Sequence, residues 1–98
     1  MAENFMCLPL AFYKIRDKSM EPAFKENDFV LVNRWQRNFS AGDVVVTWHK
    51  DLEIIKRIKK ISAGKFLLAG DSKKSMKPVW ISKKELRGKV IFKFSSGR

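Results

Sequence analysis

Two residues of this chain have the types and settings that nucleophilic catalysis requires, a serine and a lysine. Ser19 lies in the run DKSMEP over residues 17–22, and Lys56 lies among isoleucines in the run EIIKRI over residues 53–58. A lysine can replace histidine as the base that activates a serine nucleophile, provided that its amine is neutral. The pair therefore predicts acyl transfer, with Ser19 as the nucleophile and Lys56 as the general base.

The setting of Lys56 predicts that its amine is removed from water. The β-branched run over residues 54–61 indicates a strand, whose side chains alternate between two faces, so Ile54, Lys56 and Ile58 share a face that can pack inward. Desolvation there would lower the lysine pKa from about 10.4. The alternative is that Lys56 extends past the isoleucines and keeps its ammonium in water. The opposite face carries a row that can stay in water: Ile55, Arg57 and Lys59.

Ser19 also has two possible roles. Serine is a common helix N-cap, and Glu21 and Pro22 are both acceptable in a first helical turn. On the local sequence alone, the cap is the favoured role. The role of nucleophile depends on which other segments accompany Ser19.

The elements that must position the two residues are mostly strands. We expect strands at residues 10–15, 29–33, 43–48, 53–61, 65–69 and 89–94, with turns at residues 27–28, 41–43, 63–64 and 70–71. One helical turn is expected after Ser19, and a second short helix at residues 82–86, where Ser82 and Glu85 have the spacing of a capping box and Gly88 follows as a stop. The pattern predicts a single domain over residues 1–98, mostly β, built on a coiled antiparallel sheet or partly open barrel.

The order and spacing of these segments resemble the serine-lysine peptidases. That superfamily includes type I signal peptidases, LexA-type self-cleaving repressors and the proteases that mature nickel superoxide dismutase. The resemblance implies the fold shared by signal peptidases and the LexA C-terminal domain. It also implies a protein or peptide substrate bound in extended form beside the site, with small side chains next to the cut. The resemblance covers about residues 13–94 and rests on the Ser19 run, residues 27–32, residues 42–46, the Lys56 run, residues 66–72 and residues 86–90.

The catalytic residues can be carried over from this resemblance one by one. Ser19, followed by Met20 and Pro22, matches the nucleophile block, and Lys56, followed by an arginine, matches the general-base block. Asn27-Asp28 stands where the family usually has Gly-Asp. The change is mild, because asparagine tolerates a left-handed turn almost as well as glycine.

The supporting residues match less completely. Asp71 lies in Gly-Asp-Ser where the family has Gly-Asp-Asn, and Ser75 would match the serine that hydrogen-bonds the catalytic lysine. Signal peptidases continue with Ser-x-Asp-Ser-Arg, whereas this chain continues with MKPV over residues 76–79 and lacks that aspartate and arginine. Asp17 stands where some signal peptidases have a serine that donates to the oxyanion. A carboxylate cannot donate, so we expect the backbone N–H of Ser19 to be an oxyanion donor.

Other features bound the location and the cofactors. The apolar stretch over residues 5–13 is interrupted by Pro9 and is shorter than the roughly 20 residues of a transmembrane helix, so no transmembrane anchor is expected. Cys7 is the only cysteine and cannot form an internal disulfide, which favours a cytoplasmic location, and a small buried hydrophobe is its expected role. His49 is the only histidine and is expected in a hairpin loop. We therefore expect no metal and no organic cofactor.

The charge of the chain supports a rival interpretation. Lysine and arginine total 21 against 10 acidic residues, a net charge of +11, and a basic β domain with exposed aromatics can bind single-stranded nucleic acid. Trp35, Trp48 and Trp80 are candidate stacking platforms, although core or edge packing is their favoured role. The basic residues are dispersed along the chain, as on a solvated surface, and could also attract an acidic protein or an anionic membrane.

The main prediction is a serine endopeptidase that removes a leader or a segment from a protein precursor through an acyl-enzyme. The alternative is a catalytically impaired peptidase fold, or a basic β domain, that binds nucleic acid or an acidic protein partner.

Overall fold

The structure is a computed structural model that describes residues 2–7, 9–73 and 77–95, with side chains described from residue 9 onward. Eight strands form one sheet in the order β1-β2-β3-β8-β4-β5-β6-β7, and every pairing is antiparallel. β1 and β7 are the two open edges of this sheet. The elements are β1 (Ala2–Cys7), β2 (Leu10–Ile15), β3 (Phe29–Asn33), β4 (Val44–His49), β5 (Leu52–Ser62), β6 (Lys65–Ala69), β7 (Val79–Ser82), the 3₁₀ helix η1 (Lys83–Glu85) and β8 (Leu86–Phe94).

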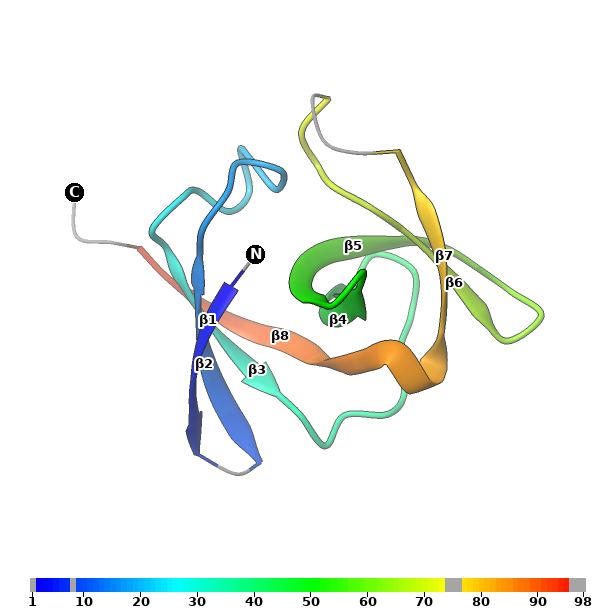
Figure 1. Cartoon of the computed structure of the whole chain (residues 1–98), viewed down its shortest axis with the longest axis horizontal. Helices are drawn as coiled ribbons and strands as arrows, with labels where there is room; N and C mark the ends of the chain where they lie inside the picture. The colour runs from blue at the N-terminus through cyan, green and yellow to red at the C-terminus, as the bar shows by residue number, and fades with distance from the viewer. Residues whose placement is uncertain (1, 8, 74–76, 96–98) are drawn as a thin grey trace.

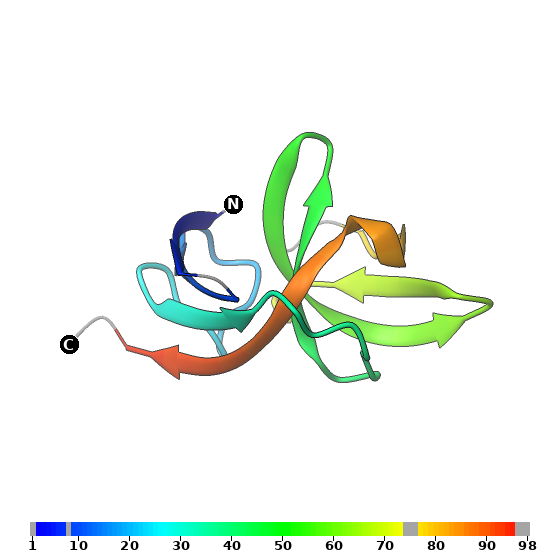
Figure 2. The ribbon, with the colours of Figure 1, turned by 90° about the horizontal axis from the view of Figure 1, so that it is seen from below.

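The long strand β8 joins the two halves of the sheet, with β1 to β3 on one side and β4 to β7 on the other (Figures 1 and 2). Its first residues pair with β4 and its later ones with β3, and Lys89 has a partner in each strand. The sheet is therefore coiled, so a face that looks outward in one half can be covered by the other half. This confirms the predicted mostly β, coiled antiparallel fold.

The coil gives the domain two hydrophobic clusters instead of one. Val44 and Val46 of β4 belong to the first cluster, whereas Val45 between them belongs to the second. A strand covered on both faces needs consecutive apolar residues, and the run VVV in β4 meets this need. The first cluster contains Ala11, Tyr13, Ile15, Met20, Val30, Val32, Val44, Val46 and Ile55, and the second contains Val45, Ile58, Phe66, Leu68, Ile81 and Leu86.

Two turns of the same construction lead into β3 and β4. Asn27 and Gly42 have positive φ angles of 75° and 96°, and each precedes an aspartate. The carboxylates of Asp28 and Asp43 each accept a hydrogen bond from the backbone N–H three residues earlier, at 3.0 and 2.9 Å. Asparagine thus takes the left-handed position that glycine takes in the second turn, as the sequence predicted.

The helical predictions need correction. Residues 18–24 form hydrogen-bonded turns, with Phe24 N donating to Met20 O at 2.9 Å, so the predicted helical turn after Ser19 is present but does not continue into a helix. The short helix near residue 84 exists as η1, but Ser82 Oγ donates to the Glu85 carboxylate instead of capping a backbone N–H. The capping-box prediction is therefore wrong in its partners. In this single 3₁₀ turn, the Ser82 and Glu85 side chains bond to each other, so neither is free to cap a backbone N–H.

Strands β1 and β7 were not predicted. β1 has the sequence AENFMC, without a β-branched residue, and β7 is only four residues long. Both are edge strands, whose extended conformation is stabilised by pairing with β2 and β6. β1 therefore lacks a strong local strand signal, and in β7 that signal is confined to a short segment.

A buried tyrosine connects β2 with β5 across the first cluster. Tyr13 Oη donates to Glu53 Oε2 at 3.1 Å and accepts from Arg34 Nη1 at 3.2 Å. Burial, followed by the negative charge of Glu53, raises the pKa of Tyr13 to about 12. The phenol therefore stays neutral in the folded protein at pH values where a free tyrosine ionises.

Titration of Tyr13 provides the first testable prediction. Because the folded-state pKa is raised, the resulting stabilisation is complete below about pH 10 and is lost as pH rises from there through about 12. Tyr13 is the only tyrosine, so the ultraviolet absorbance of its phenolate reports this site alone. We expect a midpoint well above 10 and no phenolate signal in Tyr13→Phe. A midpoint near 10 in a protein that circular dichroism shows to be folded would contradict the buried contact.

Candidate active site

Ser19 lies in the loop between β2 and β3, which is anchored at two places. The adjacent Met20 is 1% exposed and packs in the first cluster, while Pro22 is exposed. Ser72 N donates to Ser19 O at 2.8 Å, so the loop after β6 meets the Ser19 loop directly. Ser19 itself is partly exposed, as a nucleophile that must meet a substrate should be.

Lys56 lies in β5 and is 3% exposed. Ile54 and Ile58 on the same strand face are also buried, and Val45 of β4 lies directly opposite Lys56. The predicted burial of Lys56 is confirmed, and the alternative of an extended, solvated side chain is wrong. Lysine is rarely buried in soluble domains unless it is paired, so this position is unusual for a merely structural residue.

The prediction for the other face of β5 is wrong in part. Ile55 is 5% exposed and belongs to the first cluster, and Arg57 is half-buried, so only Lys59 of the expected row stays in water. β5 pairs with β4, and the coiled sheet covers both faces of these two strands at this level. Alternation of side chains locates a residue on a face but does not say whether that face is covered.

Arg57 ties the strand that carries Lys56 to the loop after β6. Its Nε and Nη2 donate to the two oxygens of Asp71 at 2.9 and 2.8 Å, and its Nη1 donates to Gly42 O at 2.8 Å. The hydrogen bonds from Arg57 hold the pKa of Asp71 below its usual range. The next residue, Ser72, binds the Ser19 loop. Asp71 therefore holds the loop that lies between the Lys56 strand and the Ser19 loop.

Asp17 accepts hydrogen bonds from both the hydroxyl and the backbone N–H of Ser19. Its Oδ1 accepts hydrogen bonds from Ser19 Oγ at 3.0 Å and from the Ser19 backbone N–H at 3.1 Å. Partial desolvation raises the pKa of Asp17, but hydrogen bonds, led by that from the Ser19 N–H, outweigh it and lower the pKa overall. The carboxylate is thus ionised at neutral pH. Sequence reasoning missed this contact, although an aspartate two residues before an N–H donor is a common turn-forming arrangement.

Two opposing effects act on the Lys56 amine. Burial lowers its pKa, while the negative charge of Asp17 acts in the other direction. The net shift is downward, which is the direction that a general-base lysine requires. Asp17 therefore acts on both residues: it accepts hydrogen bonds from Ser19, and its charge raises the pKa of Lys56. Among the described residues, the Ser19 hydroxyl donates to Asp17 and not to Lys56 Nζ, so the transfer of its proton to Lys56 stays a prediction.

The remaining residues predicted from the sequence have different outcomes. Ser75 lies outside the described residues, as does the side chain of Cys7. His49 ends β4 beside the hairpin turn, as expected. The favoured role of the tryptophans, core or edge packing, is wrong for the core, because Trp35 is 70% exposed and Trp48 and Trp80 are exposed as well. Trp80 lies in the edge strand β7.

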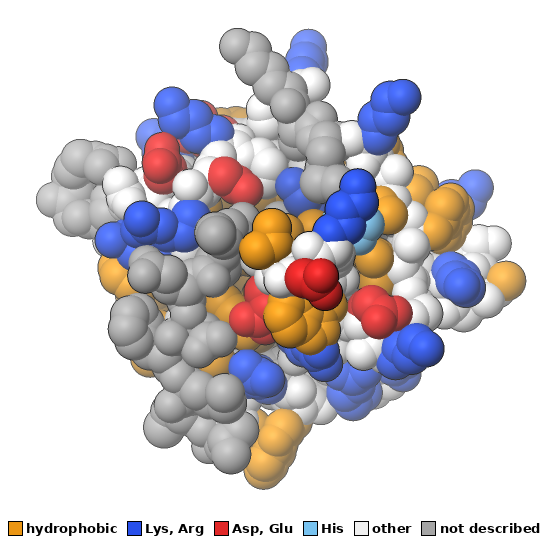
Figure 3. Space-filling model, in the orientation of Figure 1, with side chains coloured by type: hydrophobic (Ala, Val, Ile, Leu, Met, Phe, Trp, Pro, Cys, Tyr) orange, Lys and Arg blue, Asp and Glu red, His pale blue; other side chains and the backbone are white. Residues whose placement is uncertain are grey.

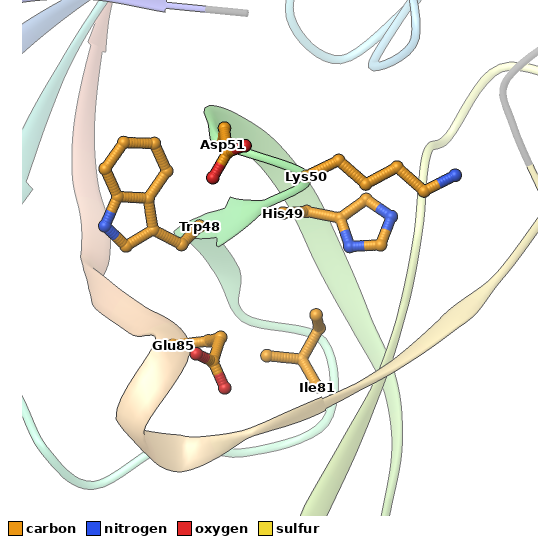
Figure 4. Close-up of a pocket in the computed structure, with 6 residues that line it drawn as sticks. All are labelled: Trp48, His49, Lys50, Asp51, Ile81 and Glu85. Carbon is orange, nitrogen blue, oxygen red and sulfur yellow. The ribbon is translucent and has the colours of Figure 1, made fainter.

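A pocket of about 470 Å³ lies beside the β4–β5 hairpin (Figure 4). Ile81 of β7 and Glu85 of η1 face the hairpin residues across it. Neither Ser19 nor Lys56 lines this pocket. The hairpin contributes Trp48, His49, Lys50 and Asp51.

Two further findings concern metals and membranes. Within the described ranges, no three His, Cys, Asp or Glu side chains are grouped so that they could hold a metal ion. In the same part of the chain, no helix has the length and apolar character needed to cross a membrane.

Comparison with models of protein families gives a match to this chain. The model of a family described as Peptidase S24-like matches residues 7–91, a range that contains both Ser19 and Lys56. A search of curated proteins finds no match to the chain. The family match agrees with the resemblance seen in the sequence and with the coiled β-sheet.

Proposed function

Because the chain belongs to the Peptidase S24-like family, we propose that it is a serine endopeptidase with a dyad of Ser19 and Lys56. The observation that carries the proposal is Lys56, a lysine 3% exposed whose pKa is lowered by burial. Buried, perturbed ionisable groups are more common at functional sites than elsewhere. The link from the Lys56 strand through Asp71 and Ser72 to the Ser19 loop supports the same pairing.

The proposed reaction proceeds through an acyl-enzyme. Neutral Lys56 Nζ takes the Ser19 hydroxyl proton as Oγ bonds to the peptide carbonyl carbon, and the Ser19 N–H donates to the oxyanion. When the intermediate collapses, the C–N bond breaks and the leaving amine takes the proton from the Lys56 ammonium. Lys56 then deprotonates a water molecule, which hydrolyses the ester and returns Ser19 to its starting form.

The proposed substrate is a protein precursor from which a leader or a segment is removed. By resemblance, the substrate lies in extended form beside the site and has a small residue next to the cut. The proposal includes a cytoplasmic location, which the single cysteine supports. It needs no metal and no organic cofactor, because the serine and the lysine supply the nucleophile and the base.

The experiment that tests this function is a mass-spectrometric comparison of protein N-termini. A cell extract is incubated with the purified wild-type protein or with Ser19→Ala, and new N-termini are identified. We expect N-termini preceded by small residues to appear only with the wild type. Identical sets of N-termini from the two proteins would reject the proposal.

A second candidate function, binding of single-stranded nucleic acid, is favoured by the exposure of all three tryptophans. Two observations weaken it. Arg57 is occupied by Asp71, and basic side chains are spread over the visible face of the molecule instead of lining one groove (Figure 3). A salt titration of oligonucleotide binding separates the functions. Tight, salt-sensitive binding that Trp35→Ala weakens and Ser19→Ala leaves unchanged would favour the second.

A further inference from the structure

Asp17 takes both hydrogen-bond donors of Ser19 that the proposed reaction needs. Ser19 Oγ donates to Asp17 Oδ1 at 3.0 Å, and the Ser19 N–H donates to the same oxygen at 3.1 Å. In the reaction, the hydroxyl proton must pass to Lys56, and the N–H must meet the oxyanion of the substrate. A carboxylate oxygen at this place resembles that oxyanion in its charge and in its hydrogen bonds.

The charge of Asp17 also acts on the base. A neighbouring anion favours the ammonium form of a lysine, and Asp17 opposes the effect of burial on Lys56 in this way. Only the neutral amine can accept the Ser19 proton. The same carboxylate thus works against the nucleophile, the oxyanion donor and the base.

We propose that Asp17 is an autoinhibitory residue that holds the Ser19–Lys56 dyad in a resting state until a bound substrate displaces its carboxylate. The inference rests on the proposed function and adds a regulatory device to that site. Asp17 is exposed, so its carboxylate can turn into water without passing through the core. When it leaves, the Ser19 N–H becomes available to the scissile carbonyl oxygen, and the Ser19 hydroxyl can turn to Lys56.

The resting state depends on the charge of Asp17 more than on its shape. Asp17→Asn keeps the size of the side chain but removes its charge, and its amide can donate to an oxyanion. Glu21→Gln is the matched control, because it makes the same chemical change two residues after Ser19, at a residue with no role in the proposed reaction. Asp17→Ala removes both oxygens and tests whether the effect depends on the new amide.

The test uses p-nitrophenyl acetate as the acyl donor, with peptide mapping to count acetyl groups on Ser19 alone. Attack by Ser19 Oγ forms the acetyl ester and releases p-nitrophenolate. We expect Ser19 acetylation at neutral pH to be roughly tenfold faster in Asp17→Asn, because loss of the negative charge lowers the Lys56 pKa and so increases the share of neutral amine. Ser19 acetylation should also be faster in Asp17→Ala than in the wild type, and Glu21→Gln should react at the wild-type rate.

A second readout does not depend on activity. Nitrogen-15 NMR of lysine side chains follows the pKa of Lys56, which should fall in Asp17→Asn and stay constant in Glu21→Gln. The midpoint of the pH–rate profile for Ser19 acetylation should fall with it. A merely structural role for Asp17 would not move either midpoint.

The outcomes separate this inference from the proposed function. If wild-type Ser19 is acetylated in a Lys56-dependent way and Asp17→Asn is no faster, the inference is wrong and the function stands. An unchanged Lys56 pKa in Asp17→Asn also overturns the inference. If Ser19 is acetylated in none of the proteins, the proposed function fails, and the inference fails with it.

Discussion

Ser19→Ala and Lys56→Ala should each lower kcat/KM for precursor cleavage by roughly 10⁴-fold to 10⁶-fold, and the double variant should lose no more than either single one. Residues that act as one unit show such non-additivity. Without the Ser19 nucleophile there is no hydroxyl proton for Lys56 to accept, and without Lys56 the Ser19 hydroxyl is not activated. The measurement is the initial rate of cleavage of a precursor identified from its new N-terminus. Losses that add up in the double variant would show that the two residues do not form one dyad.

Two kinds of control keep this result specific. Lys60→Ala and Ser62→Ala change exposed residues of β5, the strand that carries Lys56, and should cleave at the wild-type rate. Lys56→Met keeps the aliphatic stem in the core and removes only the amine, so it should be folded and inactive. Activity retained in Lys56→Met would exclude Lys56 as the base.

Gly88→Ala should destabilise the domain by about 3 kcal/mol, near the upper end of the usual cost of overpacking. Gly88 is buried in β8, and a Cβ there would lie 2.7 Å from Asn33 O and 2.7 Å from Val32 Cγ1. It would also lie 3.0 Å from Arg34 Cα. Backbone atoms at the end of β3 cannot give way as the tip of a flexible side chain would, so β8 would have to move.

Gly64→Ala is the control for the effect of an added methyl group. A Cβ at Gly64 has no atom within 4 Å among its described neighbours, but its φ of +74° disfavours alanine. We expect a cost of roughly 1–2 kcal/mol from this conformation. Equilibrium urea unfolding compares the two variants. If Gly88→Ala costs no more than Gly64→Ala, the close packing of β8 against β3 is contradicted.

Most strands could be predicted because their signals are local. The bounds of β2, β3 and β6 agree with the sequence prediction, and those of β4 and β5 differ by one residue at each end. β-branched runs and turn residues such as Asn27 and Gly42 act on their immediate neighbours, so their effect survives without knowledge of the rest of the fold. The strand face of Lys56 was predictable for the same reason, because isoleucines at alternate positions define it, whereas the choice between a buried and a solvated amine needed the folded structure.

The errors arise where a residue's environment is supplied by distant segments. The sequence places Ile55 on the face opposite Lys56, and the coil of the sheet buries both faces. Trp35 was expected to pack and is instead in water. Alternation and residue type describe what a side chain tends to do, whereas coverage depends on which strands arrive above it.

The contacts that assemble the candidate site join residues far apart in the chain. Arg57 reaches Asp71, Ser72 reaches Ser19, and the lysine strand meets β4 and β6 on either side. The sequence predicted the candidate nucleophile, the candidate base and the strands that carry much of the core, because residue type and alternation are properties of short segments. Only the folded molecule could show which strand faces the coiled sheet covers, how Arg57, Asp71 and Ser72 link the Lys56 strand to the Ser19 loop, and where the Asp17 carboxylate lies. Those features depend on many weak contacts across β8 and its neighbours, and no single segment contains them.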